Sequence, residues 1–135
     1  MHRSCLGAVV INCRTEDLGA AGAFWGAALG HEAETTDDPR YLELDFPDGQ
    51  PKVIIQRVEH ESRVHLDIET DNVEAEVRRL EALGARRLAQ IQTWWVMEAP
   101  TGQRFCVIRP QREDFAARAE VRDADGPERR NPLAR

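Results

Sequence analysis

The stretch NVEAEVRRLEALG, residues 72–84, ends in the tripeptide Ala-Leu-Gly, and so does LGAAGAFWGAALG, residues 18–30. The two copies lie 54 residues apart along the chain. A second pair of landmarks, PDG at residues 47–49 and PTG at residues 100–102, lies 53 residues apart. Because two different landmarks agree to within one residue, the pattern indicates an internal repeat.

Both stretches have the pattern of a helix that packs on one side. The apolar positions are Val73, Val77, Leu80 and Leu83 in the second copy and Leu18, Phe24, Trp25, Ala28 and Leu29 in the first. The candidate N-terminal caps are Thr15 or Asp17 for the first helix and Asp71 or Asn72 for the second. Gly30 and Gly84 can end the helices, because glycine adopts the left-handed conformation without strain.

Short alternating or β-branched runs surround the two predicted helices and indicate strands. The runs are 8–13, 31–35, 41–46 and 53–58 in the first copy and 64–69, 86–91, 94–99 and 104–108 in the second. Each copy therefore has the order strand, helix, strand, strand, strand. We predict an α+β fold built from two βαβββ modules, at about residues 6–58 and 64–110, within a single domain of residues 1–110.

The remainder of the chain, residues 111–135, is highly charged and nearly free of large apolar residues. Such a segment buries little surface, so we expect a loosely held helix followed by disorder. Its removal is expected to harm folding less than any change in the core.

Composition excludes several classes of function. The chain is 41% hydrophobic and 31% charged, which is typical of a folded soluble domain. It has no apolar run long enough to span a membrane, and its three cysteines have no CxxC spacing, so we expect a cytoplasmic protein with reduced thiols. The net charge of −6 and the lack of a basic stripe argue against a nucleic-acid partner.

Three segments in this order resemble the vicinal oxygen chelate superfamily, which contains glyoxalases, bleomycin-resistance proteins and extradiol dioxygenases. The segments are DLGAAGAFWGAALG at 17–30, HLDIETDNVEAEVRRLEALGA at 65–85 and APTGQRFCVI at 99–108. The resemblance covers about residues 6–110 and is strongest to the superfamily's glyoxalase-like branch. It implies a curled, cup-like mixed β-sheet whose concave face holds the ligand, in a fold that hosts isomerases, lyases, dioxygenases and antibiotic-binding proteins.

Strand alternation sorts the side chains between the cup and the opposite face. If Leu66 and Ile68 pack under a helix, then His65 and its neighbours at alternate positions face the cup. The same argument makes Tyr41, Asp45, Val10, Asn12, Val96 and Glu98 candidates for the concave face. Our candidate site consists of His65 as the catalytic residue and Gln56, Glu43, Asp67, Glu69, Trp94 and Cys106 as ligand-binding residues.

Metal-dependent members of the superfamily place a ligand, typically His or Glu, on each of four strands. The matching places here are Ala8, Gln56 (or Ile54), His65 and Cys106, of which His65 alone keeps the family's residue type. A hard cation needs several oxygen or nitrogen ligands, so we predict no bound metal and no cofactor. A zinc site made of Cys106, His65 and Gln56 and a Cys/His nucleophile pair are alternatives, as is the ordinary buried thiol.

The residues therefore predict a protein that binds a small organic ligand in the cup, with or without metal-free acid/base chemistry at His65. The principal alternative is a metal-dependent lyase, isomerase or dioxygenase, and the third is a noncatalytic interaction module. Acidic candidates and a tryptophan wall, from Trp94 or Trp95, favour a cationic or neutral ligand over an anionic one. Exposed strand edges and the family resemblance predict a homodimer.

Overall fold

The computed structural model describes residues 1–47 and 49–123. The first module consists of β1 (His2–Cys13), α1 (Leu18–Leu29), β2 (Glu34–Thr35), β3 (Tyr41–Leu44) and β4 (Lys52–Arg57). The second consists of β5 (Arg63–Thr70), α2 (Val73–Ala82), β6 (Arg86–Ile91), β7 (Trp94–Glu98) and β8 (Arg104–Ile108). α3 (Phe115–Arg118) and β9 (Glu120–Arg122) follow. The order strand, helix and three strands thus occurs twice, as the repeat predicts.

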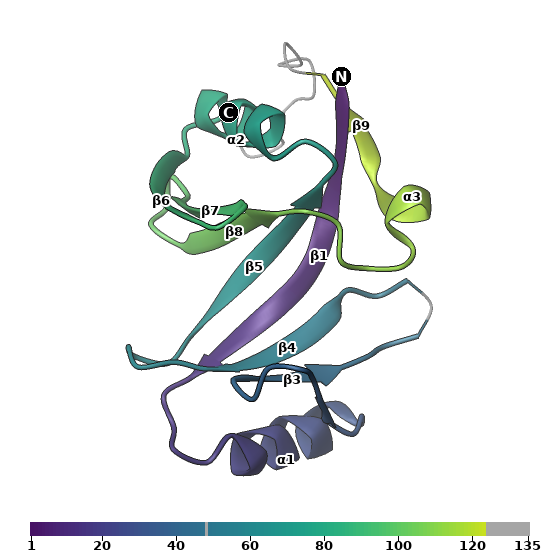
Figure 1. The fold of residues 1–135 in the computed structure, drawn as a ribbon, viewed down its shortest axis with the longest axis vertical. Helices are drawn as coiled ribbons and strands as arrows, with labels where there is room; N and C mark the ends of the chain where they lie inside the picture. Colours follow the sequence, from purple (N-terminus) through teal and green to yellow (C-terminus); the bar gives the residue numbers. More distant parts are fainter. Residues whose placement is uncertain (48, 124–135) are drawn as a thin grey trace.

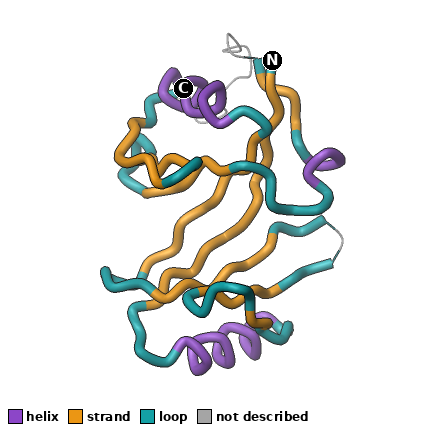
Figure 2. Tube along the Cα trace, viewed as in Figure 1, coloured by secondary structure: helices purple, strands orange, loops and turns teal. Residues whose placement is uncertain are grey.

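The strands form one mixed sheet in the order β2-β3-β4-β1-β5-β8-β7-β6. β1 and β5 are antiparallel neighbours and join the modules, and Figure 1 shows them side by side across the middle of the molecule. On either side of this pair the topology is the same, because β4 is parallel to β1 and β8 is parallel to β5. The curved sheet does not close, and the two long helices lie at its opposite ends (Figure 2). The predicted α+β fold is confirmed.

Glycines at matching places in the two modules make the same turns. Gly30 ends α1 at a φ of 79°, and Gly84 follows α2 at a φ of 109°. Gly49 and Gly102, in the turns that precede β4 and β8, have φ values of 76° and 94°. Other residues are strained in this region, so these four glycines set the ends of the helices and the turns between strands.

Side-chain caps begin both helices. The Asp17 carboxylate accepts a hydrogen bond from the backbone N–H of Ala20 at 3.0 Å. The Asn72 side chain accepts one from Ala75 at 3.1 Å. Each cap is one of the two alternatives that the sequence offered, and each satisfies a donor that would otherwise lack an intrahelical partner. None of the described helices has the length and hydropathy needed to cross a membrane.

Residues 111–123 pack more firmly than their composition suggests. β9 pairs with the first residues of β1, which extends β1 to His2. The Arg112 guanidinium donates hydrogen bonds to the carbonyls of Leu6 and Gly49, at 2.9 and 3.0 Å. These bonds use the backbone as acceptor, so apolar content gives no sign of them. The expected disorder concerns residues 124–135, which lie outside the described part of the chain.

Candidate functional site

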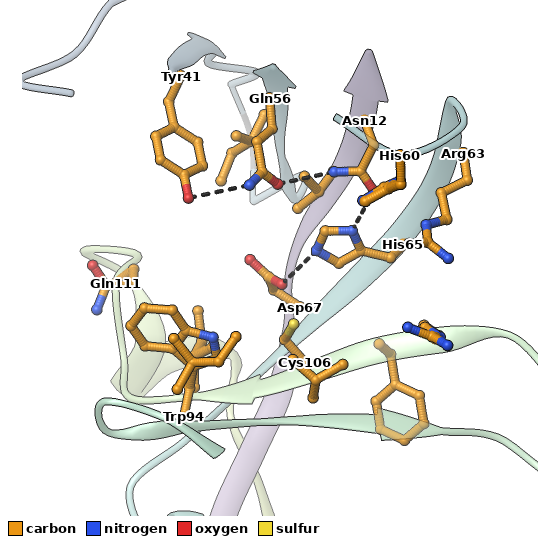
Figure 3. A pocket seen from close by; sticks show the side chains of 17 residues that line it. Asn12, Tyr41, Gln56, His60, Arg63, His65, Asp67, Trp94, Cys106 and Gln111 are labelled. Atoms are coloured by element: carbon orange, nitrogen blue, oxygen red, sulfur yellow. Dashed lines mark hydrogen bonds and ion pairs between the residues drawn. The ribbon is translucent and has the colours of Figure 1, made fainter. Parts of the chain in front are cut away.

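A pocket of about 490 Å³ lies on the concave face, where the two modules meet. Its walls come from β1 and from β3 to β8, so residues far apart in the sequence are gathered at one place (Figure 3). Most of the lining is apolar, and polar side chains converge from the five neighbouring strands β3, β4, β1, β5 and β8. This combination is typical of a site that encloses an organic molecule and orients it.

A chain of hydrogen bonds crosses the pocket from β3 to β5. Gln56 Nε2 donates to the Tyr41 hydroxyl at 3.3 Å, and Asn12 Nδ2 donates to Gln56 Oε1 at 2.9 Å. Asn12 Oδ1 in turn lies 2.8 Å from Nδ1 of His65. Figure 3 shows these four side chains in line. The register explains the arrangement, since Gln56 is the strand partner of both Asn12 on β1 and Tyr41 on β3.

The Asn12 amide, whose Nδ2 donates to Gln56, presents its Oδ1 to Nδ1 of His65. Asn12 Oδ1 can only accept, so the Nδ1 atom of His65 carries a hydrogen. In the neutral ring Nε2 is then unprotonated, and it lies 3.4 Å from the Asp67 carboxylate. The two side chains are 16% and 13% exposed, so both are within reach of a ligand in the pocket. This geometry makes Nε2 a proton acceptor whose product, the imidazolium, would have a carboxylate beside it.

Cys106 lies next to this pair. Asp67 and Cys106 are partners in the parallel register of β5 and β8, which places the thiol and the carboxylate on the same face. Burial, together with the nearby Asp67 charge, raises the pKa of the Cys106 thiol to about 12. The thiolate is therefore scarce at neutral pH, and the residue is a poor nucleophile without a partner that removes its proton.

The apolar part of the pocket includes Trp94, Val96, Ile54 and Ile108. Trp95, the next residue, points to the other side of the sheet, where it packs on the core of Val77, Met97 and Val107. The Arg87 guanidinium lies 5.0 Å from the centre of a Trp95 ring. Strand alternation predicted that the two tryptophans face opposite sides, and the structure identifies Trp94 as the one that lines the pocket.

Five of the predicted site residues come together here: Gln56, His65, Asp67, Trp94 and Cys106. Glu43 and Glu69 do not line the pocket. Glu43 lies farther along β3 and forms an ion pair with Lys52 at 3.2 Å. Glu69 is fully buried and accepts hydrogen bonds from the backbone N–H groups of Gln111 and Arg112, at 2.8 and 3.1 Å. Both residues stand at the alternate strand positions that were predicted to face the cup, but each carboxylate is bound by another part of the chain.

The candidate site also contains residues that were not predicted from the sequence. Arg63 and Arg104 line the pocket, each two residues before a predicted site residue on the same strand. Alternation alone places them on the concave face, so this signal was available. His60, in the loop before β5, also lines the pocket, and no pattern in the sequence points to it.

With the geometry described, the chain can be compared with known proteins. Residues 8–108 match the family described as the glyoxalase-like domain. The chain belongs to the glyoxalase-like domain family. It is therefore a member of the glyoxalase/bleomycin-resistance/dioxygenase superfamily, as its sequence motifs imply. No curated protein matches it.

Solved structures share the fold of this glyoxalase-like domain at low sequence identity. Methylmalonyl-CoA epimerase from Mycobacterium tuberculosis is 18% identical, with a TM-score of 0.55 over 82% of this chain and 91% of that one. A hypothetical protein from Bacillus halodurans is 13% identical, with a TM-score of 0.58 over 82% and 98%. At such identities the likeness establishes the fold and leaves the reaction open.

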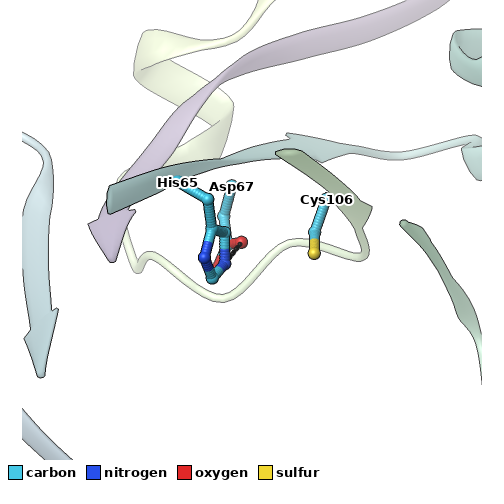
Figure 4. A group of neighbouring side chains, drawn as sticks. All are labelled: His65, Asp67 and Cys106. Atoms are coloured by element: carbon cyan, nitrogen blue, oxygen red, sulfur yellow. Dashed lines mark ion pairs between the residues drawn. The ribbon is translucent and has the colours of Figure 1, made fainter. Parts of the chain in front are cut away.

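The residues do not fit the four-ligand metal site that the superfamily implies. Ala8 has no donor atom and is buried, and the Gln56 amide already bonds Asn12 and Tyr41. Three donors do gather nearby, since ligand atoms of His65, Asp67 and Cys106 lie within 4.8 Å of one another (Figure 4). This set suits zinc better than a hard octahedral ion, and it requires the thiol to lose its proton.

Proposed function

We propose that this domain binds a small organic molecule in the cup and transfers a proton to and from it through His65. The observation that carries the proposal is the hydrogen bond between Asn12 and Nδ1 of His65, which leaves Nε2 as the proton-accepting atom, beside the Asp67 carboxylate in the pocket. A proton acceptor held in one orientation beside bound carbon is the central requirement of general-base catalysis.

The other side chains support this role in distinct ways. Gln56 and Tyr41 hold the Asn12 amide, which in turn holds the ring of His65. Once Nε2 has accepted a proton, the Asp67 carboxylate at 3.4 Å pairs with the charge. Return of that proton to a neighbouring carbon would complete an isomerisation, and an epimerisation would need a proton from a second acid on the opposite face of the same carbon. One structure of this fold is named an epimerase, so the fold accommodates such proton transfers.

Solvent exchange of substrate hydrogens tests the proposal. The purified protein is incubated in D₂O with a panel of small carbonyl compounds, and loss of the proton beside the carbonyl is followed by NMR. We expect faster exchange for at least one compound, and a loss of about 100-fold in His65→Gln, the usual scale for a general base. Glu43→Gln is the matched control, because Glu43 has the same strand parity and lies outside the pocket. Exchange that is equally fast in His65→Gln would refute the assignment.

Metal-dependent chemistry is the second candidate, and one observation favours it. His65, Asp67 and Cys106 bring three possible ligands of different type to one face of β5 and β8. Zinc would lower the pKa of the thiol and could then be retained by these residues. Metal content after dialysis separates this candidate from the first.

We also propose a homodimer, formed through the face of β1 and β5 opposite to the pocket. His65 and Asp67 face the pocket, so Val64 and Leu66 point the other way, and they are 56% and 43% exposed. Leu6, also on this face through its pairing with Ile68, is 39% exposed. A contiguous apolar strip of this kind favours association. We expect sedimentation to give a dimer that Leu66→Lys dissociates and Phe24→Lys, a change on exposed α1, does not. A wild-type monomer at micromolar concentration would exclude the dimer.

A further inference from the structure

The charges that line the pocket are opposite in sign to those of the protein as a whole. The chain has a net charge of −6, yet the Asp, Glu, Lys and Arg residues that line the pocket are Asp67, Arg63 and Arg104. The local balance is therefore positive. Glu43, Asp45 and Glu69 are acidic residues that strand alternation assigned to the concave face, and they do not line the pocket.

Neither arginine has an ion-pair partner in the described part of the chain. Within residues 1–47 and 49–123, Arg63 and Arg104 form no ion pair and donate no side-chain hydrogen bond. Glu98, the strand partner of Arg104, is engaged instead by Arg86 at 2.8 Å. Exposed arginines are often unpaired, but two on the same concave face repel each other unless an anion lies between them.

The register places both arginines at the same end of the pocket. β5 and β8 are parallel, and the first pair between them is Leu66 with Phe105. One step earlier, Arg104 lies beside His65, and Arg63 precedes His65 by two residues on the same face of β5. Figure 3 shows Arg63 and His60 on one side of His65, and Trp94 and Gln111 on the far side. A cationic end and an aromatic end therefore flank the acid/base pair.

The length of the pocket follows from strand geometry. Arg104, Cys106 and Ile108 succeed one another on the concave face of β8, and Trp94 on β7 lies next to Ile108 in the antiparallel register. The four steps from Arg104 to Ile108 span about 13 Å at the rise of a parallel strand. A molecule of this length with an anionic head and an apolar body would contact Arg104 at one end and Trp94 at the other. Its middle would lie beside His65, Asp67 and Cys106.

We infer that the ligand of this pocket is an amphipathic organic anion, whose carboxylate or phosphate is bound by Arg63 and Arg104 and whose apolar body rests against Trp94 and Ile108. The inference rests on the proposed function and adds the substrate class to it. Guanidinium groups bind both anions through paired N–H donors, so carboxylate and phosphate share the same recognition. The pocket's positive balance also raises the local concentration of anions near a protein that otherwise repels them.

A matched set of four probes tests the inference: 4-phenylbutyrate, 4-phenylbutyl phosphate, 4-phenylbutyramide and 4-phenylbutylamine. They share one body and differ in the charge of the head. Binding to the full chain is measured by tryptophan fluorescence and by NMR shifts of the tryptophan indole N–H signals. We expect the anions to bind about tenfold more tightly than the amine, and Arg63→Gln and Arg104→Gln each to weaken anion binding about tenfold, the effect of losing one charge-assisted contact. The better of the two anions then identifies the head group.

Arg109→Gln is the matched control, because it removes the same charge from the residue that follows β8 and Arg109 does not line this pocket. It should leave anion binding unchanged. Tighter binding of the amine, equal binding of all four probes, or anion binding that survives both pocket substitutions would overturn the anionic assignment while keeping the pocket as a binding site. Failure of every probe to perturb the wild-type pocket would count against the proposed function as well.

Discussion

The two modules have the same backbone plan and contribute different chemistry to the pocket. The first module supplies uncharged side chains, Val10, Asn12, Tyr41, Ile54 and Gln56. The second supplies Arg63, Asp67 and Arg104, which are all the Asp, Glu, Lys and Arg residues of the lining, together with His65 and Cys106. The first module therefore supplies groups that position other side chains, and the second supplies the groups that can exchange protons or bind ions.

This difference between the modules is clearest where β1 and β5 pair. Asn12 on β1 and His65 on β5 are hydrogen-bonded to each other. β1 and β5 are the first strands of the two modules and pair with each other antiparallel. The pairing thus allows a residue of the first module to support one of the second.

The helices of the two modules are also attached by different means. α1 approaches the sheet through small residues, since a methyl group on Gly22 would lie 2.5 Å from a side-chain carbon of Leu42 on β3. α2 instead buries the carboxylate of Glu76, which accepts hydrogen bonds from Arg79 and from His2 on β1 at 2.7 Å. Close packing holds one helix, and a buried charge network ties the other to the beginning of the chain.

The largest loss of stability that we predict is for a substitution of Glu76, the buried carboxylate of α2. Burial alone would raise the pKa of Glu76, but hydrogen bonds from Arg79 and His2 outweigh it and hold the pKa below its usual range. Glu76→Gln leaves Arg79 and His2 without their anion, and we expect a loss of about 3–5 kcal/mol in unfolding free energy at pH 7, the usual cost of breaking a buried pair.

The pH dependence gives an independent check of the Glu76 prediction. A carboxyl whose pKa is lowered on folding contributes stability that is present above its unfolded pKa and disappears as the pH falls through the folded value. The difference between wild type and Glu76→Gln, measured by urea unfolding, should be full at pH 7 and shrink in acid. Glu81→Gln, at an exposed position of the same helix, is the control. A difference that stays constant down to pH 3 would show that the carboxylate charge is not what stabilises α2.

Glu69 and Glu43 provide the next comparison, between two residues that strand alternation treats alike. Glu69→Ala leaves the backbone N–H groups of Gln111 and Arg112 without an acceptor, so we expect a loss of about 1–3 kcal/mol. Glu43→Ala breaks a partly exposed ion pair with Lys52, worth about 0–1 kcal/mol. Thermal or urea unfolding measures both changes. Equal losses would mean that the segment after β8 is not held through Glu69.

Much of the fold was predictable because its signals are local. The glycines that end the helices and make the turns need a backbone conformation that other residues avoid, and they recur at a fixed offset. The boundaries of β6 and β8 agree with the predicted 86–91 and 104–108. Alternation also brought Gln56, His65 and Asp67 to one pocket, since a strand gives its side chains only two faces to choose from.

The features that the sequence did not predict depend on contacts with parts of the chain that are remote in sequence. Glu69 has the parity of a pocket residue, but residues 111 and 112 cover it and bind its carboxylate. Gly7 accommodates that side chain, because a methyl group at Gly7 would overlap Glu69. β9 pairs with β1 through main-chain hydrogen bonds, which a charged sequence such as Glu120–Arg122 conceals. Charge along the strands likewise predicted an acidic cup, whereas pairing removed most of those carboxylates from it.

A smaller loss of stability is expected from a substitution of Asn12, the residue of the first module that bonds His65. Asn12→Ala removes the acceptor at Nδ1 of His65 and should cost about 1 kcal/mol of stability. Its specific consequence is on the tautomer, since the neutral ring is then free to carry its proton on Nε2. Nitrogen NMR of labelled histidine should show the Nδ1–H form in the wild type and a mixture in Asn12→Ala. Gln111→Ala, which changes a pocket side chain outside this hydrogen-bond chain, should resemble the wild type. A wild-type ring protonated only on Nε2 would contradict the assignment of His65 as a base.

The smallest effect that we predict is that of metal removal. Purified protein should contain well under one equivalent of divalent ion, and a chelator should leave its melting temperature unchanged, because a ligand that does not bind cannot stabilise the folded state. The reason lies in the donors. Among the residues that the structure describes, Asp67 is the single carboxylate of the pocket lining, and the thiol of Cys106, with a pKa of about 12, must lose a proton before it can coordinate. Zinc is the ion best able to meet that cost, so the decisive measurement is zinc content after dialysis in the wild type, in His65→Ala and in Asp67→Asn. One equivalent of zinc that both substitutions abolish would establish a metal site at His65, Asp67 and Cys106, and would move the chemistry of the second module from proton transfer to metal binding.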